Sequence, residues 1–228
     1  MVKHTIATKA LSRFLQLFDG NFPSGAFVHS FGLEPHIVLE AVQSIDELEI
    51  YLENFVKYQL SGMEFVFIYK VYKALKKENL NLLIKVDNDF SAMNPYEFAK
   101  SSADIGANYL KQLESHANGL TKSYFKAIKE KTSFGNELAI LGAYAYELGI
   151  EKEFFILLWC KKMLINIATT SLKISRIKPS DIQQMLFRFD VKIEKYLDID
   201  TSKYNSFNPL FEEVIYQHKT LEPKLFTT

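Results

Sequence analysis

The chain has 228 residues, and its 27 Lys and Arg residues balance 27 Asp and Glu residues, so the formal net charge is zero. A nucleic-acid binder without sequence specificity needs a basic excess to neutralise phosphates, and a disordered regulator is poor in apolar residues, so this composition excludes both classes. Because 48% of the residues are hydrophobic, the chain can bury a sizeable core, and we expect one compact domain over residues 1–228.

Cysteine content and apolar runs bear on the cellular compartment. Cys160 is the only cysteine, so it forms no intramolecular disulfide, and the apolar run 154–160 around it predicts a buried, inert thiol. This run is the longest purely apolar stretch, and it is much shorter than the roughly 18 residues of a membrane span. The N-terminus lacks the apolar region and cleavage site of a signal peptide. We therefore expect a cytoplasmic protein with no membrane and no nucleic-acid partner.

Helical periodicity predominates along the whole chain, with apolar residues at i, i+3, i+4 and i+7 spacing. The expected helices run from Ala10 to near Gly20, from about 32 to 40, from Ser44 through a stripe that reaches Leu75, from Pro95 to about Leu113, from about 121 to 129, from about 136 to 148, from 151 to about 172, from Ser180 to about Tyr196, and from Asn208 onwards.

Three expected helix starts have capping sequences, at Ser44–Glu47, Asn94–Glu97 and Ser180–Gln183. Gly62 interrupts the long pattern that begins at Ser44, and it predicts either a helix break or a close helix crossing. No alternating run is long enough for a central strand. The sequence therefore predicts an all-α fold, a single-domain bundle of about eight to ten helices, with a flexible C-terminal tail at about 218–228.

Residues of catalytic type gather in one segment of the chain. Ser24 or Ser30 with His29 would supply the nucleophile and base of a hydrolase. The sequence, however, lacks the G-x-S-x-G motif, whose tight turn exposes the nucleophilic serine in many hydrolases. The histidines are dispersed, and His29 and His36 are seven residues apart rather than at the i, i+4 spacing of a helical metal site. No phosphate-binding glycine loop occurs. These patterns predict a helical protein without catalytic apparatus that binds other proteins.

Two further features favour protein binding. Lys173 and Arg176 follow the long apolar helix, at an end where the helix dipole favours cations. The tail finishes with Leu225 and Phe226, and apolar residues at a chain end need a place to be buried. The pattern alone leaves open whether that place lies on the chain itself or in a partner.

Residues 15–19 (Leu-Gln-Leu-Phe-Asp) and 22–34 (Phe-Pro-Ser-Gly-Ala-Phe-Val-His-Ser-Phe-Gly-Leu-Glu) resemble the N-terminal signature of the urease accessory protein UreF family. The matching positions are Pro23, Gly25, Ser30, Gly32, Leu33 and Glu34. The C-terminus is similar to the family ending His-Glu-x-x-x-x-Arg-Leu-Phe, with matches at His218, Lys224, Leu225 and Phe226 and with Lys in place of Arg. Lys173 matches the family's basic residue after the long helix, but Arg176–Pro179 replaces the usual Pro-Leu-Gly-Gln.

The resemblance implies an all-α homodimer that serves nickel insertion into apo-urease by bridging UreD (also called UreH) and the GTPase UreG. It implies no catalytic step and no cofactor of its own, since the partner proteins handle nickel and GTP. It assigns to the UreD contact the tail residues His218, Lys224, Leu225 and Phe226. It assigns to the UreG face or the dimer the residues Pro23, Gly25, His29, Ser30, Gly32, Glu34 and Lys173. Two alternatives stay open, a helical hydrolase that uses Ser24 and His29 and a stand-alone nickel-binding protein.

Overall fold

The structure is a computed structural model that describes residues 8–25, 30, 32–196, 221–222 and 225–226. The chain divides into two compact units. Unit 1 comprises residues 1–25 and 67–156, and unit 2 comprises residues 26–66 and 157–228. Two of the three unit boundaries fall inside helices, at 66/67 in α4 and at 156/157 in α9. The expectation of a single domain over residues 1–228 stays a prediction.

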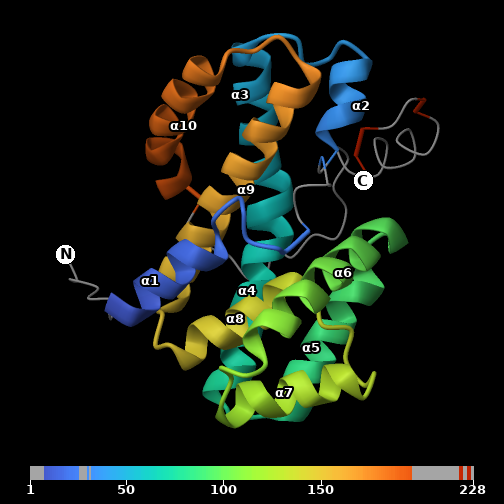
Figure 1. Cartoon of the computed structure of the whole chain (residues 1–228), viewed down its shortest axis with the longest axis vertical. Helices are drawn as coiled ribbons and strands as arrows, with labels where there is room; N and C mark the ends of the chain where they lie inside the picture. Colours follow the sequence, from blue (N-terminus) through green and yellow to red (C-terminus); the bar gives the residue numbers. More distant parts are fainter. Residues whose placement is uncertain (1–7, 26–29, 31, 197–220, 223–224, 227–228) are drawn as a thin grey trace. The chain divides into compact units, whose positions relative to one another are not determined.

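All regular secondary structure in the described ranges is helical, which confirms the all-α prediction (Figure 1). The elements are α1 (Thr8–Leu17), α2 (Leu33–Val38), α3 (Ile45–Asn54), the π-helix η2 (Phe55–Glu64), α4 (Phe65–Lys76), α5 (Leu80–Met93), α6 (Tyr96–Leu113), α7 (Gly119–Lys129), α8 (Glu137–Glu147), α9 (Lys152–Ile174) and α10 (Pro179–Glu194).

Unit 1 is built around the packing of α6 on α8. Gly106 of α6 lies against the turn before α8, where a Cβ atom at residue 106 would be 2.0 Å from the carbonyl oxygen of Gly135. The α5 helix packs on α4 through the stacked rings of Phe67 and Phe90, whose centroids are 4.0 Å apart. Small residues at one helix crossing and aromatic residues at another thus give the unit its core.

A buried carboxylate fastens the turn before α8 to α5. Asp87 is fully buried and accepts hydrogen bonds from the Ser133 hydroxyl at 2.6 Å, from the Gly135 N–H at 2.7 Å and from the Asn136 N–H at 3.0 Å. The side-chain amide of Asn136 donates a further bond to the Asp87 carboxylate and one to the Ser91 hydroxyl, both at 2.8 Å. Because this charge has several donors, it is stable in the core and holds residues 133–136 in place.

Unit 2 contains the π-helix, which is unusual in its length of ten residues. A π-helix pairs residues five apart through its backbone bonds and brings them to neighbouring turns, and the Gln59 side-chain amide donates to the Glu64 carboxylate at 3.1 Å. The indole N–H of Trp159 on α9 donates to the same carboxylate at 2.5 Å. The local π geometry therefore supplies one of the donors that satisfy a buried acid.

The α10 helix packs on α3 in unit 2 through an apolar face and a row of ion pairs above it. Arg188 lies 2.9 Å from the Glu49 carboxylate, and Lys192 lies 2.9 Å from Glu49 and 2.8 Å from Glu53. Partial burial raises the pKa of Glu49, but the hydrogen bonds and charges of Lys192 and Arg188 outweigh it, so that the pKa is lowered overall.

All three predicted helix starts are confirmed to within one residue, but only one of the three predicted caps is. Ser44 and Glu47 form both bonds of the capping box. The other two caps are wrong: Asn94 instead caps the end of α5 with a side-chain bond to the Phe90 carbonyl, and α10 starts at Pro179 without a side-chain cap. A proline with its fixed φ begins α10 and directly precedes α6, so these starts form without a hydroxyl acceptor.

Three other expectations need revision or fall outside the described residues. The sequence pattern does not predict α5, because the polar residues Asp87 and Asn88 interrupt its apolar stripe. In the structure, both side chains bind the turn before α8. A Cβ atom added at Gly62 would meet no other atom within 4 Å, so this glycine marks no close crossing, and it lies within η2 instead of at a break. The helix expected from Asn208 lies outside the described residues.

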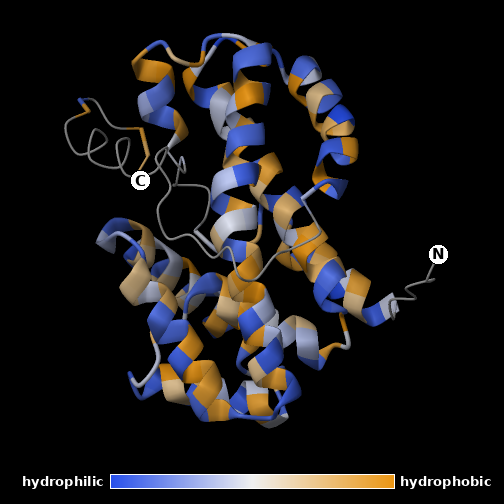
Figure 2. Cartoon of the chain, turned by 180° about the vertical axis from the view of Figure 1, so that it is seen from behind, coloured by the Kyte–Doolittle hydropathy of each residue, from blue (hydrophilic) through white to orange (hydrophobic). Residues whose placement is uncertain are grey.

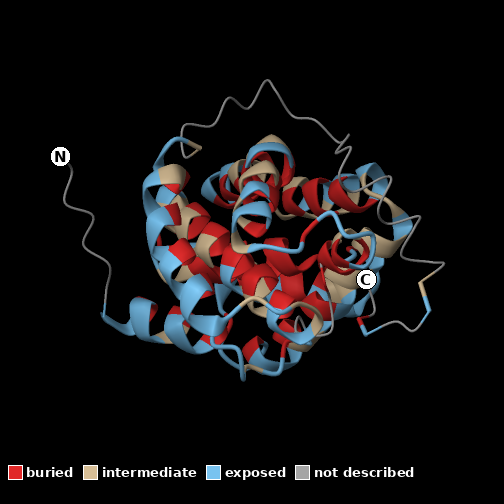
Figure 3. Ribbon diagram, turned by 90° about the horizontal axis from the view of Figure 1, so that it is seen from above, coloured by how far each residue is buried: buried red, intermediate tan, exposed pale blue. Residues whose placement is uncertain are grey.

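Within the described ranges, α9 is the one helix long and apolar enough to cross a membrane, although 61% of its most apolar window is buried within the protein. A mostly buried core helix passes the same test of length and hydropathy. Figure 2 shows the hydropathy of the residues along the ribbon, and Figure 3 shows how far they are buried. Cys160 on this helix is fully buried, as predicted, and burial together with the nearby charge of Glu64 raises the pKa of its thiol to about 12.

Candidate functional site

The predicted signature residues Gly32 and Glu34 form the start of α2. Gly32 precedes the helix with φ of 83°, a left-handed conformation that favours glycine. His36 binds the Gly32 carbonyl through Nδ1 at 2.8 Å, and its ring meets the edge of Tyr51 with the centroids 4.8 Å apart. Burial raises the pKa of Tyr51, so its hydroxyl stays neutral. The histidine thus fixes the turn from which Glu34 projects.

Glu34 joins this turn to the C-terminal tail. Its side chain is 1% exposed, and its Oε1 atom accepts a hydrogen bond from the backbone N–H of Leu225 at 2.7 Å. A bond between a buried carboxylate and a backbone amide is charge-assisted and stronger than a neutral one. The tail is therefore attached to the chain through its backbone, which leaves the Leu225 side chain 63% exposed.

The next tail residue makes the second attachment. Phe226 is 5% exposed, and the ammonium of Lys173 lies over its ring, 5.0 Å from the centroid. The desolvation of Lys173 lowers the pKa of its ammonium group. A cation over an aromatic face is attracted by the ring quadrupole, so Lys173 stabilises the docked tail.

Together these residues form what we call the tail-docking site, which consists of Glu34, Lys173, Leu225 and Phe226. Three segments that are distant in sequence, and that the family resemblance assigns to two different partners, thus meet in unit 2. The question whether the tail is buried on its own chain or in a partner is answered for Phe226, which packs on its own chain. Leu225 presents an apolar side chain beside it.

The remaining predicted residues are divided between the two units. Ser30 is fully buried in unit 2, whereas Pro23 and Gly25 belong to unit 1. Gly25 has φ of 80°, and the turn that contains it is held by the Asn108 side-chain amide, which donates to the Ser24 carbonyl at 3.0 Å. Asn108 was missed because a polar residue in a helix pattern looks solvated. His29, His218 and Lys224 lie outside the described residues.

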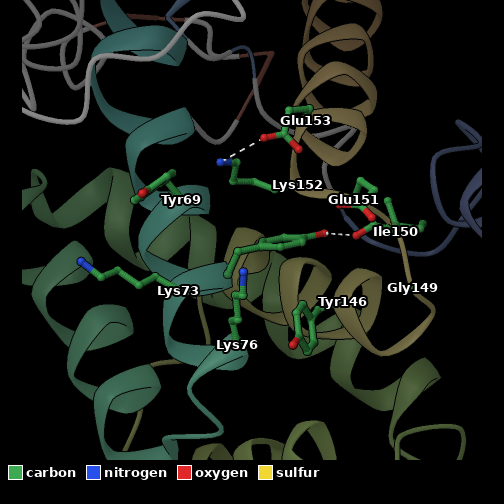
Figure 4. A pocket seen from close by; sticks show the side chains of 10 residues that line it. Tyr69, Lys73, Lys76, Tyr146, Gly149, Ile150, Glu151, Lys152 and Glu153 are labelled. Carbon is green, nitrogen blue, oxygen red and sulfur yellow. Dashed lines mark hydrogen bonds and ion pairs between the residues drawn. The ribbon is translucent and has the colours of Figure 1, made fainter. Parts of the chain in front are cut away.

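The hydrolase alternative gains no support from the described residues. Ser24 is buried with its backbone carbonyl engaged by Asn108, and its proposed base His29 is outside the described part. A surface pocket of about 660 Å³ in unit 1 is lined by tyrosines, lysines and glutamates (Figure 4). In it, Tyr72 donates to the Ile150 carbonyl at 3.1 Å and Lys152 pairs with Glu153 at 3.1 Å. No serine or cysteine is among the residues that line this pocket.

Metal-ligating side chains do not converge in the part of the chain that the structure describes. There, no group of three or more His, Cys, Asp or Glu side chains lies close enough together to hold a metal ion. His36 and His116, the two described histidines, belong to unit 2 and unit 1 respectively.

Comparison with known proteins adds a family assignment to this geometry. The UreF family matches residues 42–190, which is more than half of the chain. A urease accessory protein UreF from Bacillus sp. (strain TB-90) is 23% identical over 95% of this chain and 99% of its own length.

Two further relatives carry the same description. The urease accessory protein UreF of Streptococcus thermophilus (strain ATCC BAA-491 / LMD-9) is 22% identical over 93% of this chain and 92% of its own length. That of Ureaplasma parvum serovar 3 (strain ATCC 27815 / 27 / NCTC 11736) is 29% identical over 60% of this chain and 59% of its own length. These are accessory proteins of urease and not enzymes, and the chain belongs to the urease accessory protein UreF family.

Proposed function

We propose that this protein is a non-catalytic scaffold for nickel insertion into apo-urease, which bridges UreD (UreH) and the GTPase UreG in the cytoplasm and acts as a homodimer. Nickel and GTP are then handled by the partners, and the chain needs no cofactor of its own. The family assignment supports the accessory role. A scaffold of this kind shifts a partner between states only by its differential affinity for them.

The observation that carries the finer proposal is the tail-docking site. Lys173, the candidate for the UreG face, contacts Phe226, the candidate for the UreD contact. Glu34, from the signature segment, holds the adjacent backbone of Leu225. Because the same contacts involve both candidate surfaces, we expect a change in tail docking to alter the affinity for both partners. Leu225, with its exposed side chain, is the residue of the tail best placed to contact UreD directly.

The test is size-exclusion chromatography with light scattering of the protein alone, with UreD, and with UreD and UreG together. The wild-type chain is expected to be a dimer that takes up UreD and then UreG. Leu225→Ala keeps the backbone bond to Glu34, so it should weaken UreD binding alone. Phe226→Ala and Lys173→Ala disturb the docking of the tail itself, so each should weaken the association with both UreD and UreG.

Lys178→Ala is the matched control, since Lys178 is an exposed cation just before α10 whose side chain forms no hydrogen bond, ion pair or cation–π contact with the described residues of the tail. It should leave both associations unchanged. A monomer that takes up neither partner would refute the scaffold proposal. Unaltered association of Lys173→Ala and Phe226→Ala would remove the tail-docking site from it.

A further inference from the structure

A small polar pocket in unit 1 is independent of the tail-docking site. It lies where α1, the segment after it, α6 and α8 meet, and its volume is about 130 Å³. The polar side chains that line it are Arg13, Gln16, Gln112, His116 and Tyr144, and apolar side chains complete the wall. These residues come from three separate helices or their ends, so the pocket depends on the folded unit.

Tyr144 supplies a buried hydroxyl to this pocket. The residue is only 2% exposed, and its hydroxyl has no hydrogen-bond partner among the described residues. Among the described residues, the side-chain polar atoms that are shielded from solvent and also lack a hydrogen-bond partner are the Tyr124 hydroxyl and the Asn136 Oδ1 atom, and the Tyr144 hydroxyl is not one of them. The hydroxyl therefore retains access to open space, and the space that its side chain lines is this pocket. A buried hydroxyl with access to a pocket is a hydrogen-bonding group that a ligand can satisfy.

Arg13 supplies a positive charge. It is half-buried on α1 and forms no ion pair with any described residue. Burial raises the pKa of Tyr144, the positive charge of Arg13 opposes that rise, and Glu147 adds to it. Both Glu147 carboxylate oxygens accept bonds from Asn118, at 3.0 Å each, and Glu147 forms no ion pair with Arg13. Arg13 therefore adds a guanidinium, with its several donors, to the residues that line the pocket.

The shape and the chemistry of the pocket agree on one class of ligand. A guanidinium, a phenol, two amides and an imidazole can each donate hydrogen bonds, and the guanidinium adds a positive charge, which together suit an oxyanion. A pocket of about 130 Å³ is small, and its size suits one phosphate, sulfate or carboxylate group. Nucleotide-sized ligands need pockets of roughly 300 Å³ or more. We propose that this pocket binds one small oxyanion, with Arg13 and the Tyr144 hydroxyl as its principal ligands.

The experiment is an isothermal titration calorimetry measurement, in which inorganic phosphate is titrated into the full-length protein at constant ionic strength and pH. The proposal predicts saturable binding of one phosphate per chain, in the millimolar range or tighter, within about 20 mM phosphate. Arg13→Gln should weaken this binding at least about tenfold, because a charged hydrogen-bond donor is lost. Tyr144→Phe keeps the ring and removes only the hydroxyl, and it should weaken the binding severalfold.

Lys9→Gln is the matched control, since Lys9 is an exposed cation on the same helix that does not line the pocket. It should bind phosphate like the wild type. Thermal unfolding of each variant shows whether it is folded, and Arg13 is exposed enough that its replacement leaves the core intact. The absence of saturable binding to the wild type would overturn the proposal, and so would equal weakening by Arg13→Gln and Lys9→Gln.

Two further arms distinguish the source of the oxyanion. Acetate tests whether a carboxylate is accepted, and phosphoserine tests whether the pocket admits an oxyanion that is attached to a larger molecule. Binding of phosphate and acetate alone identifies a site for free anions. Binding of phosphoserine with the same dependence on Arg13 identifies a site for a terminal phosphate group.

Discussion

The substitution Gly106→Ala probes the crossing of α6 with the turn before α8. The added methyl group would lie 2.0 Å from the Gly135 carbonyl oxygen and 3.0 Å from the backbone nitrogen of Glu137, both of them backbone atoms. Neither can move freely, because Asp87 holds the Gly135 N–H at 2.7 Å. The methyl group must therefore displace α6 or break the buried network around Asp87.

We expect a net loss of about 2–3 kcal/mol in the free energy of unfolding, taking about 3 kcal/mol or more for the overpacking and returning about 1 kcal/mol for the better helix propensity of alanine. At about 2–4 °C per kcal/mol for a chain of this size, the midpoint of thermal unfolding should fall by about 4–12 °C. Circular dichroism and urea unfolding measure both quantities.

Gly62→Ala is the control, because a methyl group there meets no atom within 4 Å and the residue is also helical. It should leave the unfolding midpoint unchanged or raise it slightly, since alanine is the better helix former. If Gly106→Ala unfolds within about 1 °C of the wild type, the close approach of α6 to the turn does not exist in solution and the reasoning fails.

Three further predictions concern buried polar groups. Asp87→Ala leaves the N–H groups of Gly135 and Asn136 without their acceptor, so it should lower the free energy of unfolding by about 3 kcal/mol or more. Hydrogen exchange of these two amides should become fast, and unchanged exchange would contradict the network. The thiol of Cys160, with its pKa raised to about 12, should resist labelling by a disulfide reagent at pH 8 until the protein is unfolded. The pKa of the thiol is higher in the folded protein than in the unfolded chain, so ionisation of the thiol favours unfolding. The free energy of unfolding should therefore fall as the pH rises above the ordinary thiol pKa. Urea unfolding at pH 8 and pH 10 measures this fall. Glu64→Ala removes the acceptor of the Trp159 indole N–H, and it should destabilise unit 2 by about 2–3 kcal/mol. Because Trp159 is the only tryptophan of the chain, its fluorescence emission should shift, and an unaltered spectrum would refute the buried bond.

Local patterns in the sequence were sufficient for the helical class and for most helix positions. The stripes that predicted helices near 136–148 and 151–172 correspond to α8 and α9, and the Ser44 capping box is present as expected. These features depend on residues three or four apart, which any helix brings together whatever the rest of the chain does. The motifs at both ends of the chain were likewise sufficient to predict the family that the comparison shows.

Contacts between distant segments were decided only by the tertiary structure. Nothing near Asp87 in sequence indicates that it holds a turn some 46–49 residues away, and nothing near Glu34 indicates that it binds the amide of Leu225, 191 residues later. The helix pattern treats Asn108 and Arg13 as solvated polar residues, whereas one holds the Ser24 carbonyl and the other lines a pocket. A helix propensity is a property of neighbouring residues, but the partner of a polar side chain depends on which helices pack against one another, and that choice is made by the burial of the whole apolar surface.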